Sequence, residues 1–121
     1  VREYDTELTI RKETDNWGRN HGRFSGTVWS ERNPKSSSVR DRANLVRKCM
    51  NRRRVILFRK RPGPDRKLGA TRSFDWDPLN RGQWNMRAPE RGRVYAKVTP
   101  KVGDGFVCLA DYSHVILNGG S

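Results

Sequence analysis

Short runs in which polar and apolar residues alternate recur along the 121-residue chain. A period of two places every second side chain on one face, which is typical of a half-buried β-strand. Strands are predicted over residues 7–11, 22–29, 54–59, 67–71, 83–87, 93–98, 106–109 and 113–117. Proline and glycine gather between these runs, where they favour turns. The pattern predicts an all-β, single-domain sandwich of seven to nine short, mainly antiparallel strands.

The length fits one domain. We expect residues 1–121 to form a single β-sandwich domain, with an N-terminal strand and linker over 1–20 and the sandwich core over 22–117. Only residues 39–49 have the spacing of a short helix. The inward positions of the alternating runs predict a core of Phe24, Val28, Val55, Leu57, Trp84, Met86, Val94, Ala96 and Val98.

The predicted core is thin, because hydrophobic residues make up only 33% of the chain. The chain contains two cysteines, Cys49 and Cys108. In a small secreted domain such a pair is expected to form one disulfide; the alternative is two free thiols in a cytosolic protein. The chain starts at Val1, as a cleaved signal peptide or trimming would leave it. It lacks a run of 18 apolar residues, so no membrane span is expected.

Positive charge is the strongest compositional signal. The chain has 26 lysines and arginines against 13 acidic residues, a net charge of +13. Residues 47–67 contain ten basic residues, and Asp65 is their only acid. Clustered positive charge favours polyanions as partners, because it raises the local potential. A solubilising surface is the alternative interpretation.

We therefore predict a polyanion-binding site on the strand over 54–59 and its flanking loops. Arginine supplies forked donors for phosphate or sulfate. No helix or reading motif is expected to enter a groove, so binding should not depend on nucleotide sequence. The predicted binding residues are Arg52, Arg53, Arg54, Arg59, Lys60, Arg61, Arg66 and Lys67.

Several motifs are similar to those of a known group of domains. They are Gly26-Thr27-Val28, Cys49 shortly before 54–59, the run 61–69, Thr71-Arg72, Gly82-Gln83-Trp84, the run 91–98, and Cys108. From about residue 22 to residue 115 the chain resembles actinobacterial-type secreted β-sandwich domains with transthyretin-like or Cna-B-like character. The resemblance implies that the cysteine before the central strand pairs with the one on a late strand. It implies no catalytic residue. The chain departs from the pattern by a longer turn at 73–81.

That longer turn contains two aromatic residues, Phe74 and Trp76. Exposed rings can stack on sugars or bases, whereas the alternative is that both cap one end of the core. Asp75 and Asp77 are too few ligands for calcium. No metal site, cofactor or catalytic residue is predicted.

Three functions compete. The first is a secreted, non-enzymatic binding or surface module that engages anionic polymers or the cell envelope; wall polymers, glycans and nucleic acids are its candidate partners. The second is a structural subunit that self-associates by strand pairing, with Leu8 and Ile10 on a separate strand that pairs with a neighbouring copy. The third is a basic extracellular nuclease or toxin domain. Such an enzyme could use two histidines as acid and base. His21 and His114 are the only histidines of the chain, and nothing in the sequence brings them together.

Overall fold

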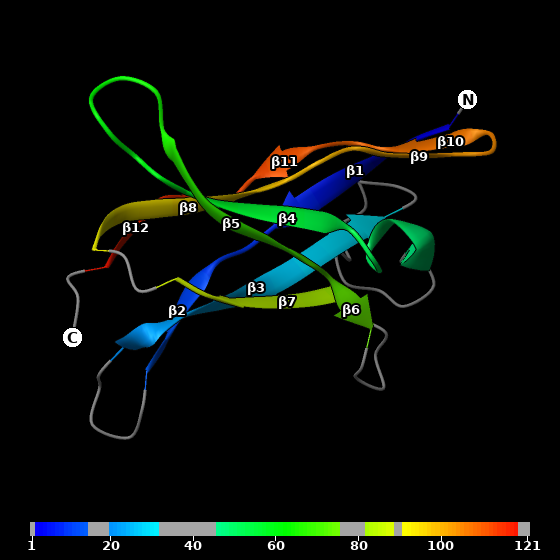
Figure 1. The fold of residues 1–121 in the computed structure, drawn as a ribbon. Helices are drawn as coiled ribbons and strands as arrows, with labels where there is room; N and C mark the ends of the chain where they lie inside the picture. The colour runs from blue at the N-terminus through cyan, green and yellow to red at the C-terminus, as the bar shows by residue number, and fades with distance from the viewer. Residues whose placement is uncertain (1, 15–19, 32–45, 76–81, 89–90, 119–121) are drawn as a thin grey trace.

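The computed structural model describes residues 2–14, 20–31, 46–75, 82–88 and 91–118. Regular structure in these ranges is almost all strand, and two sheets of mostly antiparallel strands lie in two layers (Figure 1). The predicted all-β fold is therefore confirmed. No helix within these ranges is long and apolar enough to cross a membrane.

The first sheet has seven strands, and β3 is its longest. β1 is central, because it pairs with β3 on one side and with β10 on the other. The β1–β10 pair is parallel, and the other pairs of this sheet are antiparallel. The strands are β6 (Phe74–Asp75), β7 (Gly82–Arg87), β3 (Asn20–Glu31), β1 (Arg2–Leu8), β10 (Phe106–Cys108) and β9 (Lys101–Gly103), with β2 (Arg11–Thr14) also on β3.

The second sheet has five strands and is antiparallel throughout. β8 pairs with β4 along one side and with both β11 and β12 along the other. β5 follows β4 through the hairpin loop 60–65, in which Gly63 has a φ of 106°. The strands are β11 (Asp111–Tyr112), β12 (Ile116–Asn118), β8 (Gly92–Val98), β4 (Arg54–Arg59) and β5 (Arg66–Arg72).

The main core lies between the two sheets and confirms the predicted inward faces. It includes eight of the nine predicted residues, namely Phe24, Val28, Val55, Leu57, Trp84, Val94, Ala96 and Val98. Met86 is only partly buried and packs against this core. It reaches the edge of the core beside Gly69, where an added Cβ would lie 3.1 Å from the Met86 sulfur.

The described residues form twelve strands, more than the seven to nine predicted. The additional ones, such as β6, β9 and β11, are two or three residues long, too short to show a period. Of the predicted strand over 113–117, only the last two residues belong to a strand, which is β12. Ser113 is buried instead, with its hydroxyl accepting from the Ala96 amide at 2.8 Å. In the predicted helical region only Arg47–Cys49 is a 3-10 helix, η2, and residues 39–45 lie outside the described ranges.

The N-terminal segment belongs to the sandwich itself. Leu8 and Ile10 are both 4% exposed and part of the main core. Between them, Thr9 leaves the strand, and its carbonyl accepts from Trp84 Nε1 at 3.1 Å. This contact requires a glycine at position 26, because a Cβ there would lie 1.9 Å from the Thr9 oxygen. The predicted strand over 7–11 is thus divided between β1 and β2.

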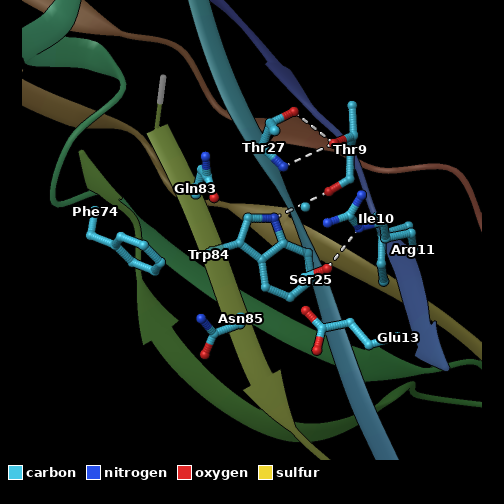
Figure 2. A pocket seen from close by; sticks show the side chains of 11 residues that line it. Thr9, Ile10, Arg11, Glu13, Ser25, Thr27, Phe74, Gln83, Trp84 and Asn85 are labelled. Atoms are coloured by element: carbon cyan, nitrogen blue, oxygen red, sulfur yellow. Dashed lines mark hydrogen bonds between the residues drawn. The ribbon is translucent and has the colours of Figure 1, made fainter. Parts of the chain in front are cut away.

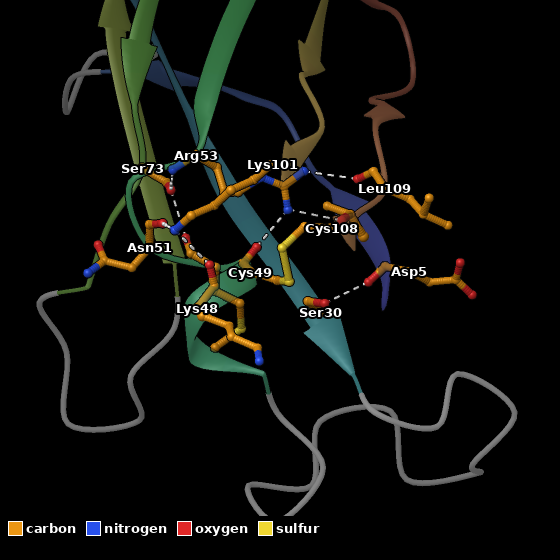
Figure 3. Close-up of a disulfide and its surroundings, with 12 residues drawn as sticks. Asp5, Ser30, Lys48, Cys49, Asn51, Arg53, Ser73, Lys101, Cys108 and Leu109 are labelled. Carbon is orange, nitrogen blue, oxygen red and sulfur yellow. Dashed lines mark hydrogen bonds between the residues drawn. A yellow bond between two sulfur atoms is a disulfide. The ribbon is translucent and has the colours of Figure 1, made fainter. Parts of the chain in front are cut away.

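A buried guanidinium joins several segments at one end of the sandwich (Figure 3). Arg53 has no exposed surface. Its Nη1 donates to Thr6 Oγ1 at 3.1 Å and to the Cys49 carbonyl at 2.8 Å, and its Nη2 donates to the carbonyls of Thr99 and Leu109, both at 2.9 Å. Burial lowers the pKa of Arg53 to about 10, so it stays charged at neutral pH. One cation therefore holds β1, η2 and the segments that follow β8 and β10.

The predicted disulfide is present beside this guanidinium. Cys49 in η2 and Cys108 in β10 are bonded, with Cα atoms 5.5 Å apart (Figure 3). Both residues are fully buried, in a second small core with Tyr4 and Val46. The bond closes a loop across 59 positions of the chain.

We expect reduction of this bond, or a Cys49→Ser/Cys108→Ser variant, to lower the free energy of unfolding by about 4 kcal/mol, since the bond restricts the unfolded chain. Denaturant titration with and without reductant measures the difference. An unchanged unfolding midpoint would contradict the expectation.

Replacing Arg53 by methionine should lower the free energy of unfolding by at least about 3 kcal/mol, because the variant leaves buried acceptors unpaired. Arg54→Met is the control, since Arg54 is the exposed neighbour and carries the same charge. Thermal and denaturant unfolding measure the stability of both variants, and Arg53→Met should be much less stable than Arg54→Met. Equal stabilities would show that the guanidinium does not hold this end together.

Candidate polyanion-binding face

The outer face of the five-stranded sheet, which we call the basic face, combines cations and aromatic rings. In β8 the side chains of Val94, Ala96 and Val98 are buried, so Arg93, Tyr95 and Lys97 point outward. The register aligns Tyr95 with Phe58 and Lys97 with Ile56 of β4. Beyond β4, it aligns Phe58 with Lys67 and Arg54 with Arg72 of β5.

Three rings form a row on this face, which we call the ring row: Phe58, Tyr95 and Tyr112. The Phe58 and Tyr95 rings stack with centroids 5.4 Å apart, and the Tyr95 and Tyr112 centroids are 6.2 Å apart. Tyr112 is 57% exposed. The Lys97 ammonium lies 5.3 Å from the centre of the Tyr112 ring. The row thus crosses three strands and carries a cation at its exposed end.

Beside one end of the basic face lies the disulfide-end cluster, to which the face itself, η2 and β9 of the other sheet contribute. It consists of Arg47, Lys48, Arg52, Arg54, Arg72 and Lys101. Lys101 Nζ donates to the carbonyls of Lys48 at 2.9 Å and Asn51 at 3.4 Å. Arg72 Nη1 donates to the Arg52 carbonyl at 3.2 Å. A shallow hollow of about 200 Å³ lies among Arg47, Lys48, Asn51, Arg52 and Lys101.

The cations of this cluster act on one another. Burial, followed by the charges of Arg53, Arg52 and Arg72, lowers the pKa of Lys101. Like charges held this close repel, and an anion placed among them relieves that repulsion. The arrangement therefore suits a phosphate, sulfate or carboxylate group of a ligand.

The hairpin between β4 and β5, at the other end of the five-stranded sheet, carries the hairpin cluster, which consists of Arg59, Lys60, Arg61, Arg66 and Lys67. Asp65 organises this hairpin by accepting hydrogen bonds from the Arg61 amide at 3.3 Å and from the Tyr95 hydroxyl. The bond from Tyr95 is the main cause of the lowered pKa of Asp65. The acid thus fixes the hairpin against the middle ring of the ring row.

The predicted binding residues separate into three groups. Arg52, Arg54, Lys60, Arg61, Arg66 and Lys67 are exposed, as expected. Arg59 is half-buried, and its guanidinium lies against Gly92, where an added Cβ would be 3.1 Å from Arg59 Nε. Arg53 is fully buried, so the prediction that it lies on the exposed face is corrected: neutral acceptors inside the protein occupy both of its Nη nitrogens.

Other residues of the basic face were not singled out from the sequence. The alternation over 93–98, which placed the valines inward, also implies that Tyr95 and Lys97 point outward. Phe58 belongs to a continuous apolar run, in which periodicity does not distinguish the faces. Arg72 lies just beyond residues 47–67 and is placed beside Arg54 by the pairing of β5 with β4. Lys101 is distant in sequence, and its hydrogen bonds to the Lys48 and Asn51 carbonyls bring it to the same cluster.

A hollow of about 500 Å³ lies on the outer face of the seven-stranded sheet (Figure 2). It is lined mainly by hydroxyl, amide and charged side chains, and Trp84 donates to the Thr9 carbonyl in its wall. Arg11 Nε donates to Ser25 Oγ at 2.9 Å inside it. Phe74 lies at its edge and is 36% exposed, whereas Trp76 lies outside the described residues. Of the two predicted aromatic contacts, Phe74 is thus the one that the structure places at this hollow.

Of the two histidines, the candidate acid–base residues, the structure describes the side chain of only one. His114 is exposed, and the side chain of His21 lies outside what the structure describes. No group of three or more potential metal ligands occurs among the described residues.

Comparison with known proteins finds no matching family model, no matching curated protein and no matching solved structure.

The Tyr95 hydroxyl should resist ionisation. Burial, then the hydrogen bond to Asp65 and its charge, raise the pKa of Tyr95 to about 12. A tyrosine in the unfolded chain ionises at about 10. The contribution of this interaction to stability is thus complete below about pH 10 and is lost as the pH rises to about 12.

Near-ultraviolet titration of tyrosinate, as the difference between the native protein and Tyr95→Phe, measures this pKa. Asp65→Asn should lower it without restoring the ordinary value, since burial remains. Ionisation of Tyr95 at its ordinary pKa in the native protein would contradict the geometry.

Proposed function

We propose that the protein is a secreted, non-enzymatic binding module that engages anionic polymers through the basic face. The observation that carries the proposal is the gathering of cations in the disulfide-end cluster, where a cross-strand pair of arginines lies close to further cations. Arg54 of β4 faces Arg72 of β5, and both are exposed. Like charges placed directly opposite destabilise a sheet. An anion that lies between two such cations relieves their repulsion and therefore stabilises the sheet.

An extended polymer fits the spacing of the two clusters better than a small anion does. The disulfide-end cluster and the hairpin cluster lie at opposite ends of β4, which has six residues. At about 3.3 Å per residue, their separation is roughly 20 Å. A chain with repeated negative groups can contact both clusters at once, and each contact releases condensed counterions.

The secreted location is part of the proposal. The Cys49–Cys108 bond supports it, because disulfides persist in oxidising compartments. The resemblance to secreted β-sandwich domains is consistent with the same location.

Assembly through strand pairing is the alternative function, and the structure makes its predicted route unfavourable. β1 is already paired within the chain, with β10 over Arg2–Tyr4 and with β3 over Asp5–Leu8. β5 ends the pairing order of the five-stranded sheet. It carries Arg66, Lys67 and Arg72, and charges on an edge strand oppose pairing with a second copy.

The test compares two double variants that remove the same charge from matched places. Arg54→Ser/Arg72→Ser removes a cross-strand pair from the basic face. Arg23→Ser/Arg87→Ser removes an exposed cross-strand pair from β3 and β7 of the other sheet. Affinity for heparin, duplex DNA and anionic wall polymer is measured from low to physiological salt.

The native protein should bind all three polymers, with affinity that falls steeply as salt rises. The Arg54/Arg72 variant should bind more weakly and, on duplex DNA, reduce the salt slope by about 2. The Arg23/Arg87 variant should retain most of the affinity. Absence of binding at low salt would refute the proposed function. Equal losses in both variants would show that net charge, and not the basic face, attracts the polymer. Cleavage of the DNA would instead support the nuclease alternative.

A further inference from the structure

We infer that the ring row is a stacking platform for the bases of single-stranded nucleic acid. This inference rests on the proposed function and names the polymer class that the basic face prefers. It is carried by three neighbouring rings on the basic face that have a lysine beside each end of their row.

The ring row begins beside the hairpin cluster and runs from there across the strands of the basic face. Phe58 and Tyr95 are neighbours across β4 and β8, and Tyr112 of β11 is aligned with Lys97 of β8. On the other side, Phe58 is aligned with Lys67 of β5. Each end of the ring row therefore has a lysine beside it, which places a phosphate contact next to a stacking surface.

The platform is held in shape before any ligand binds. Tyr95 is fixed by its hydroxyl, which donates to Asp65, and by its stack against Phe58. The Lys97 ammonium lies near the Tyr112 ring and adds a cation–π contact. Because these side chains are already ordered, binding loses little rotamer entropy at them.

The chemistry of the row favours unpaired bases over other anionic polymers. Every base presents a flat π surface, and base–aromatic stacking does not depend on sequence. Bases of a duplex are stacked on one another and do not offer that surface. Sulfated and uronic glycans contact the cations but contain no aromatic base. Cations alternating with aromatic rings on an exposed sheet are the combination that single-strand binding requires.

Tyr112 is the ring to test, because it is the most exposed of the three. The variant is Tyr112→Leu, and the matched control is Phe74→Leu, which removes an exposed ring from β6 of the other sheet. The probes are an unstructured thymidine oligonucleotide, an abasic strand of the same length, a duplex of that length and heparin. Affinities are measured by fluorescence anisotropy or competition at low salt.

The native protein should bind the thymidine strand more tightly than the abasic strand. Tyr112→Leu should weaken binding of the thymidine strand by about 5- to 150-fold, the range expected for one lost base stack. Its affinity for heparin and for the abasic strand should stay within about twofold of the native value, which also shows that the variant is folded. Phe74→Leu should bind all four probes as the native protein does.

The outcomes separate this inference from the proposed function. Equal binding of the thymidine and abasic strands, unaffected by Tyr112→Leu, overturns the stacking platform and leaves polyanion binding intact. A loss confined to Phe74→Leu overturns it as well and places base contacts at the hollow on the other sheet. Absence of binding to every probe refutes both proposals.

Discussion

The buried guanidinium of Arg53 is the interaction on which the arrangement of this end of the sandwich depends. Its four acceptors come from β1, η2 and the segments after β8 and β10, which belong to both sheets or connect them. Three are backbone carbonyls and one is a hydroxyl, so the cation is hydrogen-bonded by neutral groups. A buried charge is costly unless it is hydrogen-bonded, and the segments are therefore constrained to keep their carbonyls in place.

The same arrangement explains why positive charge concentrates nearby. Ser73 locks the turn before β4 by accepting from the Arg53 amide at 2.8 Å and donating to the Met50 carbonyl at 2.7 Å. This turn sets Arg52 and Arg54 outward on either side of Arg53, with Arg52 at a φ of 54°. Strand pairing then adds Arg72, and the β9 segment adds Lys101. The buried charge lies beneath exposed charges of the same sign, which raises the potential at this surface.

Sequence patterns predicted the fold where a local period was present. Val94, Ala96 and Val98 alternate with polar residues, so their burial was predictable, as was the turn around Gly63. The division between β1 and β2 was not predictable, because it depends on Trp84 Nε1 reaching the Thr9 carbonyl from a distant strand. Met86 was assigned to the core from alternation alone, but it lies at the edge of the packed region.

The candidate site was predictable only in part, for a similar reason. Six of the eight predicted cations are exposed, since charge on a strand end or hairpin normally faces solvent. Arg53 is the exception, because its acceptors are supplied by segments as far as 56 positions away. The ring row depends on the register of three strands, and no local pattern in the sequence specifies that register.

Backbone amide chemical-shift mapping tests the central claim most directly, because it shows which face contacts the ligand without changing any residue. Isotope-labelled protein is titrated at low salt with heparin and with the thymidine oligonucleotide. We expect both ligands to shift amides of β4, β5 and β8, and the oligonucleotide alone to produce the largest shifts at Tyr95 and Tyr112. Shifts centred on β3 and β7, or spread evenly over both sheets, would contradict the assignment of binding to the basic face.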